Sequence, residues 1–155
     1  MPIETALKES KIRHLALSSL VYVEPGTSLG DVIQVMKRER AACVVVCKND
    51  RVAGIFTERD LLTKAIGASV DYDSPIDGLM TPEPKTLSLD DSVADAIILM
   101  HEGGYRHIPL VDEQGRVTGL LAVRNIIEFL AEHFPDEVLN LPPRIHQRMG
   151  APEGA

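Results

Sequence analysis

The segment from Gly54 to Asp60 (GIFTERD) places a glycine, an apolar residue, a hydroxyl and a carboxylate at short fixed spacings. Gly54 carries no side chain, so a flat ring could approach its backbone closely, and Ile55 offers an apolar face beside it. Thr57 is predicted at the start of a helix, where free backbone N–H groups favour phosphate or other polar ligand atoms. Asp60, one turn further on, could accept both hydrogens of a ribose diol. This segment is our first candidate for a binding site.

The same residues have a purely structural interpretation. Thr57 followed three residues later by Asp60 also matches a capping box, in which the acidic side chain accepts a hydrogen bond from the N–H of the residue at the helix start. Local sequence alone leaves both interpretations open.

An internal repeat organises the elements around this segment. Shifted by 64 residues, Val21–Met36 aligns with Lys85–Met100, with matching serine, aspartate, isoleucine and methionine positions. After one inserted residue, Gly115, the offset becomes 65, and the segment 51–54 (RVAG) aligns with 116–119 (RVTG). Only two copies are present and each is small, so we expect two subdomains that face each other.

Each copy predicts the order β-α-β-β-α. Apolar, β-branched runs indicate the strands, and Ser or Thr residues that can cap helices mark the helix starts. In the first copy we expect a strand at 20–23, a helix at 28–40, strands at 42–46 and 52–56, and a helix at 58–66. In the second we expect a strand at 86–87, a helix at 92–101, strands at 107–111 and 117–121, and a helix at 123–133.

Five segments follow from this assignment. They are a helical lead-in at 1–17, the first repeat at 18–67, a linker at 68–84, the second repeat at 85–133, and a tail at 134–155. Within the lead-in we expect a helix over 4–17, and within the linker a short helix near 76–79. The tail contains several prolines, so we expect it to be extended or ordered only by packing on something else.

The chain resembles a tandem pair of cystathionine-beta-synthase (CBS) domains, or Bateman module. The resemblance rests on the duplicated order of elements, on GIFTERD at Gly54–Asp60 and on MTPEP at Met80–Pro84. The resemblance covers about residues 14–133. It implies an α/β (α+β) fold of two tandem β-α-β-β-α repeats packed face to face with pseudo-two-fold symmetry. It also implies a regulatory, energy-sensing module that binds AMP, ADP or ATP in the cleft between the repeats and acts by conformational change, with S-adenosylmethionine as an alternative ligand and no metal required.

The resemblance extends the candidate site into the linker and the second repeat. In the family, a pocket built on the aspartate of one repeat is completed by the first strand of the other repeat and by the turn before its next strand. The implied binding residues are Ile55, Thr57, Asp60, Met80, Thr81, Lys85, Arg106, His107, Ile108 and Pro109. On its own chemistry, Arg106 is a permanent cation and His107 a second donor suited to phosphate. A surface ion pair is the alternative for Arg106.

The second copy departs from the pattern, with Ala122 and Asn125 where the first copy has Thr57 and Asp60. Ala122 has no hydroxyl, and Asn125 offers one carbonyl acceptor in place of a carboxylate. We therefore expect unequal pockets, with ribose held less well beside Asn125. The segment that would face phosphate there offers almost no polar group beyond Arg40, so this pocket is also expected to be poor in phosphate-binding groups.

Composition argues against several functions. The chain has 155 residues, 45% hydrophobic and 25% charged, with 16 Lys plus Arg against 23 Asp plus Glu. The formal charge of −7 disfavours nucleic acid and anionic lipid, so single-stranded nucleic acid binding through Arg106 is the weakest alternative. With no signal-peptide pattern and no long apolar run, we expect a cytoplasmic protein with no membrane partner.

The remaining features favour structural roles. Cys43 and Cys47 are expected to be buried core thiols, and no histidine shows metal-ligand spacing with them. No catalytic signature is present, so we do not expect an enzyme. We expect a homodimer and an unidentified regulated protein. The alternative is a ligand-free dimerisation or adaptor module. The apolar helix faces that could form a dimer contain Leu61, Leu62, Ile66, Ile126, Ile127, Phe129 and Leu130.

Overall fold

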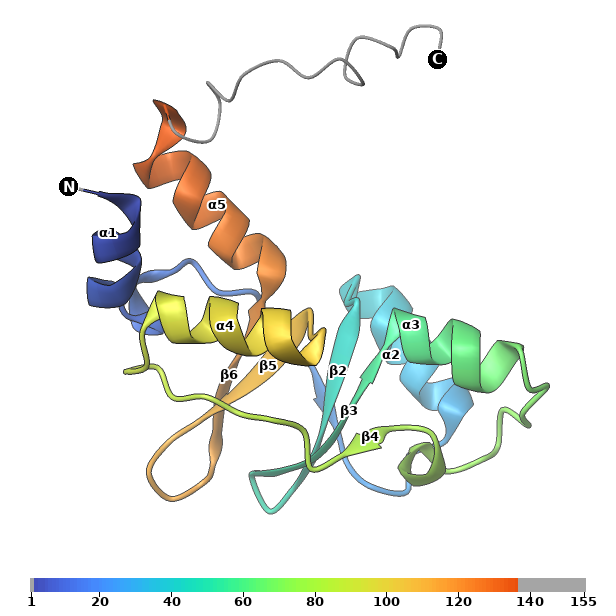
Figure 1. Ribbon diagram of the computed structural model, residues 1–155. Coiled ribbons are helices and arrows are strands. Elements are labelled where there is room, and N and C mark those ends of the chain that lie inside the picture. The colour runs from blue at the N-terminus through green and yellow to red at the C-terminus, as the bar shows by residue number, and fades with distance from the viewer. Residues whose placement is uncertain (1, 137–155) are drawn as a thin grey trace, which may run out of the picture.

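Two half-molecules of similar construction lie side by side in the computed structural model, which describes residues 2–136 (Figure 1). The first contains β1 (Tyr22–Val23), α2 (Leu29–Glu39), β2 (Cys43–Lys48), β3 (Arg51–Thr57) and α3 (Glu58–Asp60), which continues as the π-helical η2 (Leu61–Ile66). The second contains α4 (Val93–Gly103), β5 (His107–Val111), β6 (Val117–Ala122) and α5 (Val123–His133). The predicted mixed fold class of two tandem repeats is confirmed.

The two long helices of equivalent position start and end alike. Ser28 Oγ accepts a hydrogen bond from Asp31 N at 3.1 Å, and Ser92 Oγ accepts one from Asp95 N at 3.0 Å. Each helix ends at a left-handed residue, with φ of 53° at Arg40 and 69° at Gly104. The left-handed conformation is unstrained for glycine but costs an L-residue about 1–2 kcal/mol.

Each sheet is extended by pairing with a segment outside its own hairpin. The first sheet has the order β1-β2-β3-β4, and β4 (Thr81–Pro82) comes from the linker and pairs antiparallel with β3. The second sheet is the β5-β6 pair, flanked by single bridges of Leu87 with Leu110 and of Ser18 with Leu120. The strand predicted at 86–87 is thus reduced to one bridge, and β4 was not predicted.

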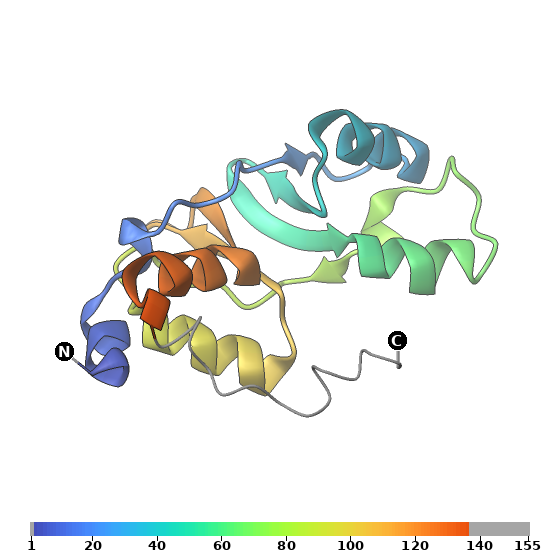
Figure 2. The same ribbon diagram turned by 90° about the horizontal axis from the view of Figure 1, so that it is seen from above.

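The N-terminal segment packs on the second half-molecule. The helix predicted over 4–17 is wrong in its extent, because α1 (Ile3–Glu9) ends before a separate 3-10 turn, η1 (Ile12–His14). Helix α1 packs against α4 (Figure 2), and Ile12 is fully buried in the core of the second half.

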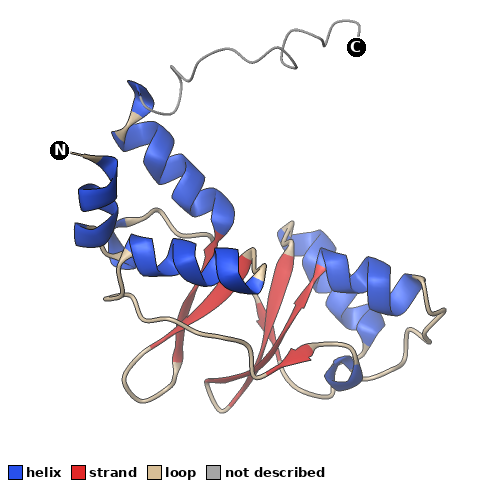
Figure 3. Cartoon of the chain, viewed as in Figure 1, coloured by secondary structure: helices blue, strands red, loops and turns tan. Residues whose placement is uncertain are grey.

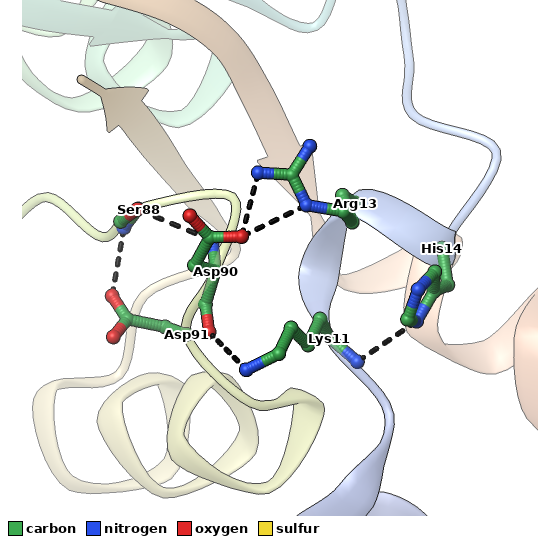
Figure 4. Close-up of polar contacts among 6 residues, drawn as sticks. All are labelled: Lys11, Arg13, His14, Ser88, Asp90 and Asp91. Carbon is green, nitrogen blue, oxygen red and sulfur yellow. Dashed lines mark hydrogen bonds and ion pairs between the residues drawn. The ribbon is translucent and has the colours of Figure 1, made fainter.

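Polar contacts hold the same segment to the loop before α4 (Figure 4). The Arg13 guanidinium donates to Asp90 Oδ1 at 2.9 and 2.6 Å, and Lys11 Nζ donates to the Asp90 carbonyl at 3.1 Å. Ser88 and Asp91 stabilise that loop, since Ser88 N donates to Asp91 Oδ2 at 2.7 Å. Residues before the first repeat thus belong structurally to the second.

A third, smaller core joins the two sheets. It contains Cys43, Val45 and Cys47 of β2, Ile55 of β3 and Leu120 of β6. Both cysteines are free and buried, as predicted. The turns of the two hairpins also meet, because Val117 N donates to the Asp50 carbonyl at 2.8 Å. Helices α1, α4 and α5 lie toward the opposite end from these turns (Figure 3).

The linker contains the short turn η3 (Ile76–Gly78), close to the helix predicted there. The expectation of an extended tail falls almost entirely on residues 137–155, outside the described part of the chain. Within residues 2–136, no helix is both long enough and apolar enough to span a membrane.

Candidate functional site

A cavity of about 630 Å³ opens between the two repeats. This volume is in the range of about 300–1,000 Å³ that small-molecule sites occupy. Its walls come from β3 and α3, from β4 and the linker beyond it, and from the turn between α4 and β5 with the start of β5. Seven of the ten predicted binding residues line it: Ile55, Thr57, Asp60, Thr81, Lys85, Arg106 and His107.

The other three predicted residues, Met80, Ile108 and Pro109, do not line this cavity. Ile108 is fully buried in the core of the second half, on the opposite face of β5 from His107. Pro109 is also buried and lies opposite Leu120 in the β5-β6 ladder. Successive side chains of a strand point to opposite faces, so Ile108 points away from the cavity, whereas Pro109 shares the face of His107 but lies further along β5 and does not line the cavity.

Met80 explains the glycine of the motif. A Cβ atom added at Gly54 would overlap the Met80 sulfur. The space beside the Gly54 backbone is therefore filled by a linker side chain, and the expectation that a flat ligand ring approaches there is wrong. Gly54 lets the linker pack closely on β3.

The Asp60 carboxylate divides its two oxygens between two kinds of partner. Oδ2 accepts hydrogen bonds from Thr57 N at 3.0 Å and Thr57 Oγ1 at 3.1 Å, while Asp60 N donates to Thr57 Oγ1 at 3.2 Å. The capping box is therefore present. Oδ1 pairs with the Lys64 ammonium at 3.3 Å. The Lys64 side chain is 42% exposed and that of Asp60 is 14% exposed, so the ammonium is the more accessible member of the pair and takes no part in the cap.

Several lining residues were missed by sequence reasoning. Tyr105 lies at the cavity wall, where its ring packs over Gly103 so closely that a Cβ atom there would overlap it. The Gly103-Gly104 pair was the available signal, since it leaves room for an aromatic ring. Others that line the wall are Ala42, Glu58, Arg59, Leu62, Glu83, Pro84 and Gly104.

The charges in this cavity balance. Its acidic lining residues are Glu58, Asp60 and Glu83, and its basic ones are Arg59, Lys85 and Arg106. A ligand that carries a cluster of negative charges would therefore face carboxylates as well as cations. An apolar surface from Ile55 and Leu62 completes the wall.

A second cavity of about 360 Å³ lies on the other side of Arg106 and His107, which line both cavities together with Ala42. The two cavities differ in volume, while the predicted difference in how well they hold a ribose stays a prediction. The expectation of few phosphate-binding groups is wrong, because Arg40, Arg106 and Arg124 all line this smaller cavity. Sequence reasoning considered only the segment that contains Arg40, and Arg124 arrives from α5.

Asn125 does not line the second cavity. Its side chain is buried, and Oδ1 accepts a hydrogen bond from Ala122 N at 2.8 Å. Nδ2 donates to Ser18 Oγ at 3.1 Å and to the Ala16 carbonyl at 3.3 Å. Asn125 therefore retains the capping role of its counterpart Asp60 and is otherwise committed to the bridge segment at Ser18.

Two titratable groups at the cavity walls have shifted pKa values. Burial lowers the pKa of His107, and the charges of Arg124 and then Arg106 lower it further. Burial raises the pKa of Cys43 to about 12, with a further contribution from the Asp60 carboxylate. The Cys43 thiol is therefore protonated at neutral pH and is a poor nucleophile. Within the described residues, no group of three or more His, Cys, Asp or Glu side chains is arranged to hold a metal ion.

Comparison with known proteins gives a consistent family match. The family model of the CBS domain matches the chain twice, at residues 12–67 and 76–132. An uncharacterised 17.7 kDa protein of Acidianus ambivalens is 30% identical over 124 residues, which are 79% of this chain and 74% of that protein. The chain also matches CBS domain-containing proteins of Arabidopsis thaliana, of which it spans only 20% of the length.

Solved structures share the fold. A CBS domain protein from Pyrobaculum aerophilum complexed with AMP has a TM-score of 0.70 at 23% identity and covers 79% of this chain and 98% of its own. The cytosolic domain of the Mg²⁺ channel MgtE in complex with ATP has a TM-score of 0.67 at 21% identity, covering 81% and 50% of the two chains.

Proposed function

Because the chain belongs to the CBS domain family and carries two copies of that domain, we propose that it is a regulatory module that binds an adenine nucleotide between its repeats. Proteins of this family are generally regulatory and not catalytic. One observation carries the proposal: the larger cavity unites Asp60, at a helix start in the first repeat, with Arg106 and His107 of the second. The AMP and ATP complexes of proteins with the same fold support the ligand class.

Each part of the nucleotide has a matching part of the cavity. In this proposal the adenine ring packs between the apolar surface of Ile55 and the ring of Tyr105. The ribose diol donates to Asp60 Oδ1 and displaces the Lys64 ammonium. The phosphate lies toward Arg106 and His107, where charge-assisted hydrogen bonds are worth about 1.5–3 kcal/mol each.

The balanced charge of the cavity bears on which nucleotide is bound. Three carboxylates face three cations there, so each added phosphate group brings more repulsion from Glu58 and Glu83. We therefore place AMP ahead of ADP and ATP. S-adenosylmethionine, which carries a positive sulfonium group, is the competing ligand that these carboxylates would favour.

Transmission requires that the ligand prefer one arrangement of the repeats. A ligand held by Asp60 from one repeat and Arg106 from the other links them, and it shifts the population by its differential affinity for the two arrangements. The output in this proposal is a homodimer interface or a partner protein. Leu62, Ile66 and Ile127 are exposed helix residues suited to such contacts, whereas Ile126 and Phe129 are buried in the core and are withdrawn from the predicted surface.

A ligand-free adaptor is the second candidate function, and one observation favours it. Both oxygens of Asp60 already have partners, Thr57 and Lys64, without any ligand. In that case the cap stabilises the helix start and the cavity has no nucleotide function.

A thermal-shift panel separates the two functions. The panel comprises AMP, ADP, ATP with magnesium, GTP and S-adenosylmethionine, because a ligand that binds only the folded state must raise the melting temperature. We expect AMP to raise it and GTP to leave it unchanged. An unchanged melting temperature with every ligand would leave the adaptor function.

A further inference from the structure

The second cavity gathers positive charge from three separate elements. Arg40 ends α2, Arg106 precedes β5 and Arg124 lies in the first turn of α5, and all three line the same 360 Å³ space. Of the residues that the structure describes, only one acidic residue, Glu39, lines it. Since the chain as a whole has a formal charge of −7, this excess of cations is local to the cavity.

Two of these guanidinium groups have no directly bonded partner in the described part of the chain. Among residues 2–136, the side chains of Arg40 and Arg106 make no hydrogen bond or ion pair. The Glu39 carboxylate pairs instead with Arg38 at 3.1 Å, and within the described part of the chain Arg124 donates only to the Ser18 hydroxyl at 3.2 Å. Clustered arginines without carboxylate partners are suited to a phosphate-type anion, because each planar guanidinium can donate two hydrogen bonds to it.

A nucleoside does not suit the same cavity. The counterpart of Asp60 is Asn125, which is only 3% exposed, does not line the cavity and has both side-chain atoms engaged with Ala122, Ser18 and Ala16. The position of Asp60 therefore has no carboxylate here to accept both hydrogens of a ribose diol, and the acidic lining residue Glu39 is paired with Arg38 at the end of α2. The volume is also little more than half that of the first cavity.

The repeat alignment shows how the two cavities diverged. Arg40 occupies the position of Gly104, which lines the first cavity, so the second cavity has a guanidinium where the first has no side chain. Arg40 holds this position with a left-handed φ of 53°. The pKa of the shared His107 is lowered first by burial and then by the charges of Arg124 and Arg106, and these two smaller contributions agree with a positive field in this region.

We propose that the second cavity binds a small inorganic phosphate anion, of the pyrophosphate class, held by Arg40, Arg106 and Arg124. This site does not depend on the proposed nucleotide function. A consequence does rest on that function: because Arg106 and His107 line both cavities, the anion and a nucleotide phosphate compete for them, and each weakens binding of the other.

Isothermal titration of the full chain with pyrophosphate tests the site, with sulfate as the control anion and AMP as the control nucleotide. We expect Arg40→Gln and Arg124→Gln each to weaken pyrophosphate binding at least about tenfold, the loss of one charge-assisted contact. Lys37→Gln removes the same charge one turn earlier on α2, outside both cavities, and should leave the affinity within about twofold.

The variant Asp60→Asn separates this proposal from the nucleotide function, since Asp60 lines only the first cavity. We expect it to retain pyrophosphate binding whether or not the protein binds AMP. The proposal is overturned if pyrophosphate binds no more tightly than sulfate, or if Arg40→Gln and Arg124→Gln bind it as well as Lys37→Gln does. Tighter pyrophosphate binding in Asp60→Asn, which removes a negative charge from the first cavity, would place the anion in that cavity and would also overturn the proposal.

Discussion

The Lys64 ammonium lies 3.3 Å from Asp60 Oδ1, while Thr57 donates both of its hydrogen bonds to Asp60 Oδ2. One carboxylate therefore caps the helix with one oxygen and holds a displaceable cation with the other. The two interpretations of the GIFTERD segment, helix capping and ligand binding, are compatible, because they use different atoms of the same side chain.

Asp60→Asn is expected to abolish the thermal shift produced by AMP with little loss of basal stability. The second repeat shows why, since Asn125 caps α5 through a 2.8 Å hydrogen bond from Ala122 N. The amide keeps an acceptor for the cap but removes the charge that accepts a ribose diol. Basal stability should fall by less than about 1 kcal/mol, against about 0.5–2 kcal/mol for Asp60→Ala. Denaturant titration gives these values. If AMP raised the melting temperature of Asp60→Asn as much as that of the unmodified protein, the assignment of Asp60 to the ribose would be wrong.

Lys64→Met is expected to strengthen AMP binding. The ligand no longer has to displace an ammonium from Asp60 Oδ1, and an exposed ion pair of this kind is worth about 0.2–1 kcal/mol. The gain in affinity should therefore be between about 1.4-fold and fivefold. Lys48→Met, at the exposed end of β2, is the control. Weaker binding in Lys64→Met, with the control unchanged, would show that Lys64 contacts the ligand itself.

Gly54→Ala is expected to destabilise the fold through Met80. The added methyl group would overlap the Met80 sulfur, and overpacking of this kind typically costs about 1–3 kcal/mol. Met80→Ala in the same chain should relieve much of that cost. A double-mutant cycle of unfolding free energies measures the coupling, and additive effects would contradict the role assigned to Gly54.

His107 is expected to lower the free energy of unfolding as the pH falls below about 6.5. Its pKa in the folded protein lies below the ordinary 6.5, so the unfolded chain takes up the proton first as the pH falls. Stability from this group is therefore fully present above about pH 6.5 and is lost as the pH falls toward the folded pKa. His107→Gln should remove this part of the pH dependence of the melting temperature, which scans between pH 5 and 8 would reveal. An unchanged pH profile in that variant would contradict the assignment.

The N-terminal segment is expected to contribute to stability through its apolar side chain more than through its ion pair. Ile12 is fully buried, so Ile12→Ala should cost about 2–5 kcal/mol. The Arg13–Asp90 pair is exposed at the surface, so Arg13→Ala should cost less than about 1 kcal/mol. Equal losses for the two variants, measured by denaturant unfolding, would contradict the packing of this segment into the second core.

Much of the fold was predictable because it is encoded locally and twice. Ser28 and Ser92 cap equivalent helices by accepting hydrogen bonds from residues three positions later. The apolar runs of β2 and β5 can each be recognised within a few residues. Two pairings have no such local signal. Ser18 pairs with Leu120, which is far away in the sequence, and β3 pairs with β4, which belongs to an irregular linker. No local pattern indicates those pairings, so they were missed.

The candidate site likewise has a part encoded by local sequence and a part set by tertiary packing. The sequence by itself determined the helix start at Thr57, the carboxylate one turn later and the replacement of that carboxylate by Asn125 in the second copy, because these are residue types at fixed spacings. Only the tertiary structure decided that Met80 fills the space at Gly54 and that Arg124 joins Arg40 and Arg106 around one cavity. The physical reason is that side-chain environments depend on which elements pack together, and that packing brings distant residues within contact distance.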